Sequence, residues 1–376
     1  MAGFYVHIPF CRQACRYCDF HFSVSVKYIP DMIDAMLKEI RLKKELFGEF
    51  GFDSLYFGGG TPSLLKVDEL NTLLESIFKH YKFNQGFEFT LEANTDDITA
   101  GYVRGLKEAG VNRLSIGIQS FYEKDLVLMR RSHSSKQAVN ALKISREAGI
   151  ENINADMIYG IPGLSSAEWE KNLDRIFEMD VQHISAYHLT FEPGTVFDHW
   201  RKKGRIIPVT DEESLEQLKI LKSITRERGF IHYEISNFGK ENFFSRHNLV
   251  YWNLLPYAGI GPSAHSYDGN CRFWNRSDNR KYMDLLGRMG NNYYEYEELS
   301  QADHYNEYLL TSLRTMWGAD LKEIERRFGE HYVKYTESIL KDQINSGWCQ
   351  RQGQKFRLSK EGIFLADKVI RDFIKI

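Results

Sequence analysis

The sequence has no excess of either charge, no long hydrophobic run and too few cysteines for a disulfide framework. Its 376 residues carry a formal net charge of −2, and 43% of them are hydrophobic and 27% charged. These values are typical of an ordinary globular protein. Because no block of Lys or Arg stands out, nucleic acid is not expected as a main partner. We find no internal repeat and no low-complexity segment.

Membrane and export signals are missing as well. No stretch approaches the roughly 20 apolar residues that cross a bilayer, and the N-terminus lacks a basic region followed by a hydrophobic core. We therefore expect the mature chain to start near Met1 and to stay in the cytoplasm. Cysteine usage agrees with a reducing compartment, because Cys271 and Cys349 are isolated and the other three cysteines are clustered.

The cysteine cluster follows the first apolar run of the chain. Cys11, Cys15 and Cys18 have the spacing C-x3-C-x2-C. Thiolates at this spacing can converge on one centre, and soft sulfur ligands favour zinc or iron–sulfur. A closed zinc site needs four ligands, and no second pair of ligands follows at a suitable spacing. The spacing therefore favours a 4Fe-4S cluster with one open iron, with a zinc knuckle, disulfides or unliganded thiols as the alternatives.

Short apolar strands alternate with amphipathic helices over the first half of the chain. We expect strands at residues 3–8, 53–57, 87–91, 113–117, 152–158 and 183–188, and helices at 27–47, 67–81, 99–109, 136–148 and 167–179. This alternation predicts an α/β fold with a parallel sheet, forming an incomplete (β/α) barrel over residues 1–270. In such a fold reactive groups gather at the carboxyl ends of the strands.

Glycines and polar residues stand at these expected strand ends. The run Gly58-Gly59-Gly60-Thr61-Pro62 follows the second strand, and its glycines would let a ligand approach the backbone amides. Glu92, Gln119 and Asp156 end the next three strands. Each alone is as well explained as a helix cap or a surface residue. Together they predict one polar rim around one pocket.

The C-terminal quarter has a different pattern. Residues 271–300 are more polar and are expected to be a connection. Residues 301–376 predict helices at 303–316, 321–327 and 333–345, a β-ribbon at 348–351 and 356–358, and a last helix at 360–374. This order resembles a winged-helix domain. Because its charges are mixed, we expect it to pack across the barrel opening or to contact a protein, and not to bind DNA.

The motifs resemble those of radical S-adenosylmethionine (SAM) proteins, in which C-x3-C-x2-C carries an aromatic residue, here Tyr17, before the last cysteine. The order Y-x-H-I-P-F-C, G-G-G-T-P, L-E-A-N, R-L-S-x-G-x-Q-S-F and D-x-I-Y-G-x-P is similar to the oxygen-independent coproporphyrinogen III dehydrogenase (HemN-like) branch, over roughly the first 270 residues. The resemblance implies that the three clustered cysteines hold a 4Fe-4S cluster and that SAM binds its open iron.

The resemblance also implies which residues contact SAM: Tyr5, Tyr17, Gly59, Gly60, Thr61, Glu92, Gln119, Arg131 and Asp156, the last three matching residues around a second SAM molecule. Carboxylates can bind the ribose hydroxyls or the ammonium group, and backbone amides the adenine and methionyl ends. An aromatic ring can cover the sulfonium. Whether one or two SAM molecules bind stays open.

Two departures from the dehydrogenase match a relative of it, the HemW group of haem chaperones. Phe20 stands where the dehydrogenase has a further cysteine, and Tyr5 has no long segment before it. Residues 246–252, Arg-His-Asn-Leu-Val-Tyr-Trp, match an H-N-x-x-Y-W motif that this group associates with haem. His247 is a chemically suitable axial ligand, and Tyr251 and Trp252 offer flat apolar surface.

Other interpretations of these residues stay open. His247 could be a buried histidine among packed aromatics. His265, in the glycine-rich turn 259–266, is a second candidate neighbour of haem or a structural histidine.

The resemblance implies a protein that holds haem and transfers it to acceptor proteins, such as respiratory cytochromes or quinol oxidases, with membrane-associated proteins among them. The retained SAM residues also fit a radical SAM enzyme that acts on a tetrapyrrole through a 5'-deoxyadenosyl radical. A structural metal module is the third alternative, and it leaves the polar rim unexplained. The oligomeric state stays open.

Overall fold

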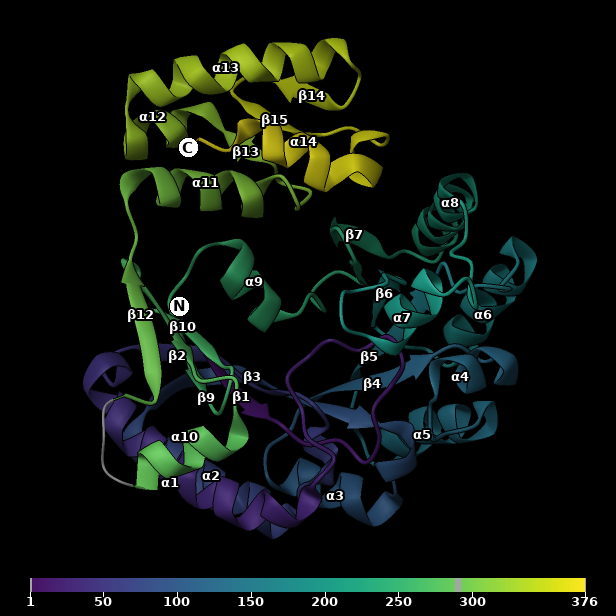
Figure 1. Cartoon of the computed structure of the whole chain (residues 1–376), viewed down its shortest axis with the longest axis vertical. Helices are drawn as coiled ribbons and strands as arrows, with labels where there is room; N and C mark the ends of the chain where they lie inside the picture. The colour runs from purple at the N-terminus through teal and green to yellow at the C-terminus, as the bar shows by residue number, and fades with distance from the viewer. Residues whose placement is uncertain (1, 288–291, 376) are drawn as a thin grey trace.

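One open, curved sheet organises the computed structural model, which describes residues 2–287 and 292–375. Its 12 strands have the order β12-β11-β10-β9-β1-β2-β3-β4-β5-β6-β8-β7. Helices cover the outer face, and the two edges of the sheet remain apart (Figure 1). The expected incomplete barrel is confirmed.

Six parallel strands form the centre of the sheet: β1 (Gly3–Ile8), β2 (Gly51–Gly59), β3 (Lys82–Asn94), β4 (Arg113–Gln119), β5 (Asn152–Tyr159) and β6 (His183–His188). The helices between them are α1 (Ile29–Phe47), α2 (Val67–His80), α3 (Ala100–Glu108), α4 (Glu123–Met129), α5 (Ser135–Glu147) and α6 (Ser166–Glu178). The predicted alternation of strands and helices is confirmed. A further strand, β9 (Tyr257–Ile260), pairs in parallel with β1.

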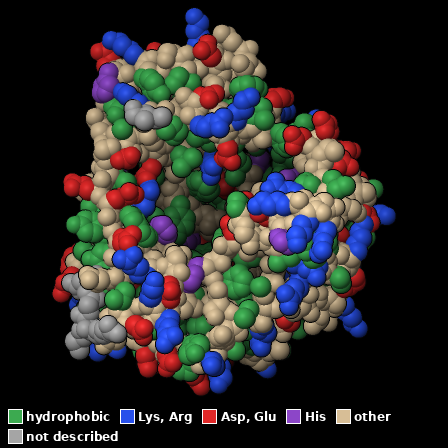
Figure 2. All heavy atoms as spheres, in the orientation of Figure 1, with side chains coloured by type: hydrophobic (Ala, Val, Ile, Leu, Met, Phe, Trp, Pro, Cys, Tyr) green, Lys and Arg blue, Asp and Glu red, His purple; other side chains and the backbone are tan. Residues whose placement is uncertain are grey.

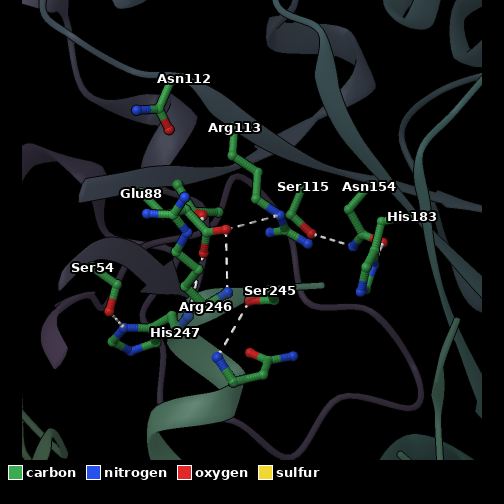
Figure 3. Close-up of polar contacts among 12 residues, drawn as sticks. Ser54, Glu88, Asn112, Arg113, Ser115, Asn154, His183, Ser245, Arg246 and His247 are labelled. Carbon is green, nitrogen blue, oxygen red and sulfur yellow. Dashed lines mark hydrogen bonds and ion pairs between the residues drawn. The ribbon is translucent and has the colours of Figure 1, made fainter. Parts of the chain in front are cut away.

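The two faces of the central strands differ in polarity. Successive side chains of a strand point to opposite faces, and one face carries buried apolar residues packed in the core, including Phe4, Leu55, Phe89, Leu114 and Ile153. The alternate positions carry polar residues, several of which converge inside the barrel: Ser54, Glu88, Arg113, Ser115, Asn154 and His183 (Figure 3). The barrel interior is therefore lined by hydrogen-bonding side chains.

The expectation that residues 271–300 form a connection is wrong. They contain β11 (Cys271–Asn275), α10 (Asn279–Gly287) and β12 (Tyr294–Glu298), and β10 (His265–Tyr267), β11 and β12 extend the sheet as antiparallel strands. Residues 288–291 lie outside the described part. In β12 the two tyrosines pack around Phe273 while the alternating glutamates face Arg272 and Arg276. Such an edge strand is polar enough to resemble a loop.

The other edge of the sheet follows β6. Helices α7 (Val196–Lys202) and α8 (Asp211–Glu227) precede the short strands β7 (Ile231–Glu234) and β8 (Asn237–Gly239), and β8 pairs antiparallel with β6. Helix α9 (Arg246–Trp252) follows and packs on β1 and β2. No helix in residues 2–287 and 292–375 is both long and apolar enough to span a bilayer.

The C-terminal part has its own core and the predicted winged-helix-like order. Helices α11 (Gln301–Ser312), α12 (Leu321–Phe328), α13 (Glu330–Asn345) and α14 (Ala366–Phe373) surround a sheet of β13 (Ala319–Asp320), β14 (Cys349–Gln352) and β15 (Lys355–Leu358). It stands above α9 in Figure 1, with α11 nearest to it. The Met316 amide donates to the Tyr233 carbonyl at 2.9 Å, which ties this part to the main sheet.

Candidate cofactor site

The three clustered cysteines lie on the loop between β1 and α1, each half-buried. The backbone of this loop is fixed by hydrogen bonds from the Cys11 amide to the Ser23 carbonyl at 3.0 Å and from the Ser23 amide to the Pro9 carbonyl at 2.8 Å. The Cys18 amide approaches the Cys15 carbonyl at 3.5 Å. The loop therefore turns back on itself and holds the cysteines at the carboxyl end of β1.

Two donors from other loops reach these sulfurs. The Thr61 hydroxyl donates to Sγ of Cys11 at 3.4 Å, and Nη1 of Arg131 donates to Sγ of Cys15 at 3.5 Å. Both contacts favour a thiolate. Burial opposes it, since it raises the pKa of Cys11 and raises that of Cys18 to about 11. The loop thus suits thiolates whose charge is balanced by a bound cationic centre.

The three cysteines do not form a site for a single metal ion. Across the described ranges, no three His, Cys, Asp or Glu side chains are arranged to hold a metal ion. This does not bear on a 4Fe-4S cluster, because each of its cysteines binds a different iron and the sulfurs need not meet at one ion.

The glycine turn after β2 packs directly against the cysteine loop. Gly59 has a φ of +106°, and a Cβ at this position would stand 2.5 Å from the ring of His7. A Cβ on Gly60 would stand 2.6 Å from the Phe10 carbonyl oxygen. Only glycine fits this close backbone approach. The Gly59 amide donates to Oε2 of Glu92 at 3.2 Å, so the turn also orients the carboxylate.

Glu92, at the end of β3, is a carboxylate without a direct basic partner among the described residues. Its Oε1 accepts a hydrogen bond from the Tyr56 hydroxyl at 2.7 Å. The pKa of Glu92 is raised to about 7, mainly by burial and also by the nearby charge of Asp156, against the opposing hydrogen bonds from Tyr56 and Gly59. Such a group gains from a bound cation, because the cation offsets the cost of the buried negative charge.

The other predicted rim residues surround the same end of the sheet. Arg131 donates from Nη2 to Oδ1 of Asn94 at 2.8 Å and to the Gly117 carbonyl at 3.2 Å. Gln119 is buried and has a φ of +64°, an uncommon conformation for a residue with a side chain. Asp156 is held by Ser115 at 3.0 Å and by Asn154, and burial raises its pKa.

Tyr17 and Tyr5 complete the predicted set from two sides. The Tyr17 side chain lies close enough to Arg131 and to the sulfurs of Cys15 and Cys18 for their charges to affect its titration. Tyr5 projects from β1, and its hydroxyl lies 3.1 Å from Nδ1 of His7. The structure therefore gathers the SAM residues expected from the motifs around the cysteine loop and the glycine turn.

A cavity of about 350 Å³ opens beside these residues. From the predicted set it is lined by Tyr5, Gly59, Glu92, Tyr251 and His265, and it is completed by His7, Phe20, His21, Tyr257 and Ser263. Its size falls within the range of ligand pockets, roughly 300–1,000 Å³. The H-N-x-x-Y-W element and the SAM rim thus share one cavity.

Helix α9 is positioned by a polar cluster in the barrel interior (Figure 3). Ser245 caps its first turn, and the carboxylate of Glu88 accepts from the amides of Arg246 at 3.2 Å and His247 at 3.3 Å. A carboxylate at a helix N-terminus is favoured by the free amides and the helix dipole. Arg113 lies 4.0 Å from Glu88 and balances its charge.

His247 is enclosed by side chains and is only 2% exposed. Its Nδ1 lies 2.8 Å from the Ser54 hydroxyl and its Nε2 lies 2.9 Å from the Tyr251 hydroxyl. Its ring stacks on Tyr56 at 4.9 Å and on Tyr5 at 6.1 Å. Burial lowers the pKa of His247 to about 3, so the imidazole is neutral. An iron bond from His247 stays a prediction that requires Ser54 or Tyr251 to move away.

The remaining haem candidates differ in position. The Tyr251 ring lines the cavity and meets Tyr257 edge-on at 4.7 Å. Trp252 is half-buried and is not part of the cavity lining; its Nε1 is buried and has no partner among the described residues. His265 lies on the cavity wall and is exposed.

Several lining residues were not predicted from the sequence. His7 could have been found, because it lies two residues after Tyr5 and therefore points to the same face of β1. Tyr257 lies on β9, opposite Gly3 of β1, and a strand pairing between distant segments gives no local signal. His21 and Ser263 lie in loops, where the spacing of residues along the sequence does not indicate their positions in space.

Known proteins resemble this chain in sequence over its whole length. Residues 5–176 match the radical SAM superfamily model, and residues 299–365 match the HemN C-terminal domain. The chain is 33% identical to heme chaperone HemW of Bacillus subtilis (strain 168) over 100% of this chain and 99% of that protein. It is 34% identical to heme chaperone HemW of Synechocystis sp. over 75% of this chain and 70% of that protein.

The fold also matches a solved structure, that of coproporphyrinogen III oxidase (HemN) from Escherichia coli, described as a radical SAM enzyme. The TM-score is 0.86 at 22% sequence identity, and the match covers 100% of this chain and 90% of that chain. At this identity the match shows a common fold. With the full-length relatives, it follows that the chain belongs to the HemW family of radical SAM proteins.

Proposed function

We propose that this protein holds haem beside helix α9 and passes it to acceptor proteins, and that it carries a 4Fe-4S cluster with SAM next to the haem. One observation supports this most. A single cavity is lined both by Tyr251 of the H-N-x-x-Y-W element and by Tyr5, Gly59 and Glu92 of the SAM rim. The relatives that match the whole chain are named heme chaperone HemW, which fits a haem-binding role for this cavity.

Cys11, Cys15 and Cys18 would hold the cluster, which supplies one-electron chemistry when bound. The donors Thr61 and Arg131 are already directed at two of the sulfurs. Their hydrogen bonds would partly neutralise the thiolates and so help to set the reduction potential of the centre. Three cysteines leave one coordination position for an exogenous ligand.

Glu92 and the glycine turn would bind SAM at that open position. The buried carboxylate of Glu92 would pair with a positive group of the ligand, and the Gly59 amide and the Tyr56 hydroxyl keep the carboxylate oriented. Gln119 is the last residue of β4 and Asp156 lies on the neighbouring strand β5. Both would contact the ribose or a second SAM molecule.

Haem would occupy the side of the cavity formed by α9 and β9. The rings of Tyr251 and Tyr257 line it and meet at 80°, so the face of one ring can pack against a porphyrin while the other ring borders its edge. The molecule is deeply hollowed at the centre of the view in Figure 2. A planar ligand held in an open hollow keeps one edge accessible, as transfer to an acceptor requires.

The proposal is tested with anaerobically reconstituted protein. One sample receives haem, and another receives coproporphyrinogen III with SAM and a reductant. A stable Soret band at one haem per chain, together with no decarboxylated tetrapyrrole, is the expected result. Decarboxylated product without stable haem binding would replace the chaperone by a radical SAM enzyme that acts on a tetrapyrrole.

A further inference from the structure

We propose that His265 supplies the imidazole that binds the haem iron, which rests on the proposed function and assigns its ligand. The cavity wall offers this imidazole directly. Three observations carry the assignment: the environment of His247, the freedom of the His265 ring and the rigid turn that holds His265.

The first observation is that His247 is fully engaged. Both of its ring nitrogens have hydrogen-bond partners, Ser54 and Tyr251, and its ring is stacked on Tyr56. To bind iron, it would have to lose one hydrogen bond and leave a buried polar group unpaired, which is unfavourable. In this arrangement His247 instead fixes the Tyr251 hydroxyl and so aligns a cavity wall.

The second observation is that the imidazole ring of His265 is accessible to a ligand in the cavity. It is exposed and lines the cavity, and within residues 2–287 and 292–375 its ring nitrogens make no hydrogen bond to a side chain or backbone atom. Its ring lies 6.5 Å from that of Trp274, its cross-strand neighbour on β11. A metal ion can therefore reach His265 without breaking a contact, while Trp274 limits the directions in which the ring can turn.

The third observation is a buried clamp beneath the turn that carries His265. Lys43 and Glu39 of α1 form an ion pair at 2.8 Å, and both are completely buried. Lys43 donates to the Gly259 carbonyl at 2.7 Å, and Glu39 accepts from the Gly261 amide at 2.8 Å. The same pair also bonds the side chains of Asn275 and Tyr282, so one buried hydrogen-bond network joins α1, this turn and β11.

The turn itself is tightly packed above this clamp. A Cβ on Gly259 would stand 2.0 Å from the His265 carbonyl oxygen, so the strands β9 and β10 approach too closely for any side chain there. Ser263 has a φ of +64°. A non-glycine residue keeps such a conformation only when its surroundings enforce it. His265 is therefore presented by a preorganised support, as metal-ligand sites require.

Four variants test the assignment: His265→Ala, His247→Gln, His21→Ala in the same cavity, and His199→Ala, an exposed histidine of α7 outside the cavity lining. Each is reconstituted with the cluster and titrated with haem. The readouts are the affinity for haem, the position of the Soret band and the low-temperature electron paramagnetic resonance spectrum of the ferric haem. Iron content and SAM affinity report whether the fold and the cluster site are intact.

We expect His265→Ala to weaken haem binding by roughly tenfold or more and to lose the spectrum of histidine ligation, with cluster and SAM binding unchanged. Added imidazole should restore that spectrum. His247→Gln, His21→Ala and His199→Ala should keep it. Wild-type ligation in His265→Ala, or its loss in His247→Gln with a full cluster, would overturn the assignment while leaving haem binding in place. Absence of haem binding in the wild type would instead reject the proposed function itself.

Discussion

The ring of His247 stacks on the ring of Tyr56, with centroids 4.9 Å apart and planes inclined by 25°. The hydroxyl of Tyr56 in turn donates to Glu92 at 2.7 Å. One tyrosine of β2 therefore contacts both the element associated with haem and the carboxylate proposed to bind SAM. This contact directly connects the two proposed sites, although neither Tyr56 nor His247 lines the cavity.

Replacing Tyr56 by Phe should test this connection. The ring that stacks on His247 is kept, and only the hydrogen bond to Glu92 is lost. Because hydrogen bonds to charged groups are worth about 1.5–3 kcal/mol, we expect SAM affinity to fall roughly ten- to a hundredfold while haem affinity stays nearly unchanged. Calorimetry with each ligand measures both. An unchanged SAM affinity would show that Tyr56 does not orient the carboxylate.

SAM binding should depend on pH through Glu92. Burial raises the pKa of this carboxyl to about 7 in the protein without ligand, so it is largely protonated below pH 7 and charged above it. A cationic ligand favours the charged form. Affinity should therefore fall as the pH drops below 7, approaching about tenfold per pH unit, and binding should release a proton.

Glu92→Gln is the matched variant for this pH dependence. It keeps the size of the side chain and removes its titration, so its SAM affinity should be weak and nearly constant between pH 6 and 8. A wild-type pH profile in this variant would show that another group titrates. Proton release is measured by calorimetry in two buffers of different ionisation enthalpy.

The cluster should require three cysteines and no others. Cys11→Ala, Cys15→Ala or Cys18→Ala should each abolish the cluster after anaerobic reconstitution, since a missing thiolate leaves too few ligands. Cys271 lies on β11, and Cys349 is buried in the C-terminal core, so neither replacement should lower the iron and sulfide content. If either one does, the centre has a fourth protein ligand and no open iron for SAM.

The buried pair of Lys43 and Glu39 should be important for stability. Lys43→Met keeps most of the side-chain volume but leaves the Glu39 carboxylate buried beside Tyr282 and Asn275 without its cation. Removing one partner of a buried ion pair typically costs about 3–5 kcal/mol. Chemical denaturation measures the change. Lys44→Met, exposed on the same helix, is the control and should have almost no effect.

Much of the fold was predictable because the strands are apolar and regularly spaced. Strands β1 and β6 have the predicted bounds, and the helices begin close to recognisable caps such as Ser134 and Ser165. The antiparallel edge was missed although Tyr294-Glu295-Tyr296-Glu297 alternates aromatic and charged residues, as a half-buried strand does. The high polarity of the segment outweighed that alternation, and its pairing with β11 depends on a partner that local pattern does not identify.

The site was predictable as a set of residues but not as a set of contacts. Motif order grouped Glu92, Arg131 and the cysteines, and the structure places them at one end of the sheet. The motifs could not show that His247 is enclosed, because Ser54, the hydrogen-bond partner of His247, lies 193 residues away in the sequence. The motifs also could not show that Lys43 of α1 supports the turn before His265.

Transfer of haem tests the central claim most directly. Haem-loaded protein is mixed with membranes that contain an apo-quinol oxidase, and oxidase activity is followed against an equal concentration of free haem. The proposed function predicts faster recovery of activity from the haem-loaded protein, together with loss of its own Soret band. Recovery no faster than with free haem, while the protein keeps its haem, would contradict a role in delivering haem to acceptors.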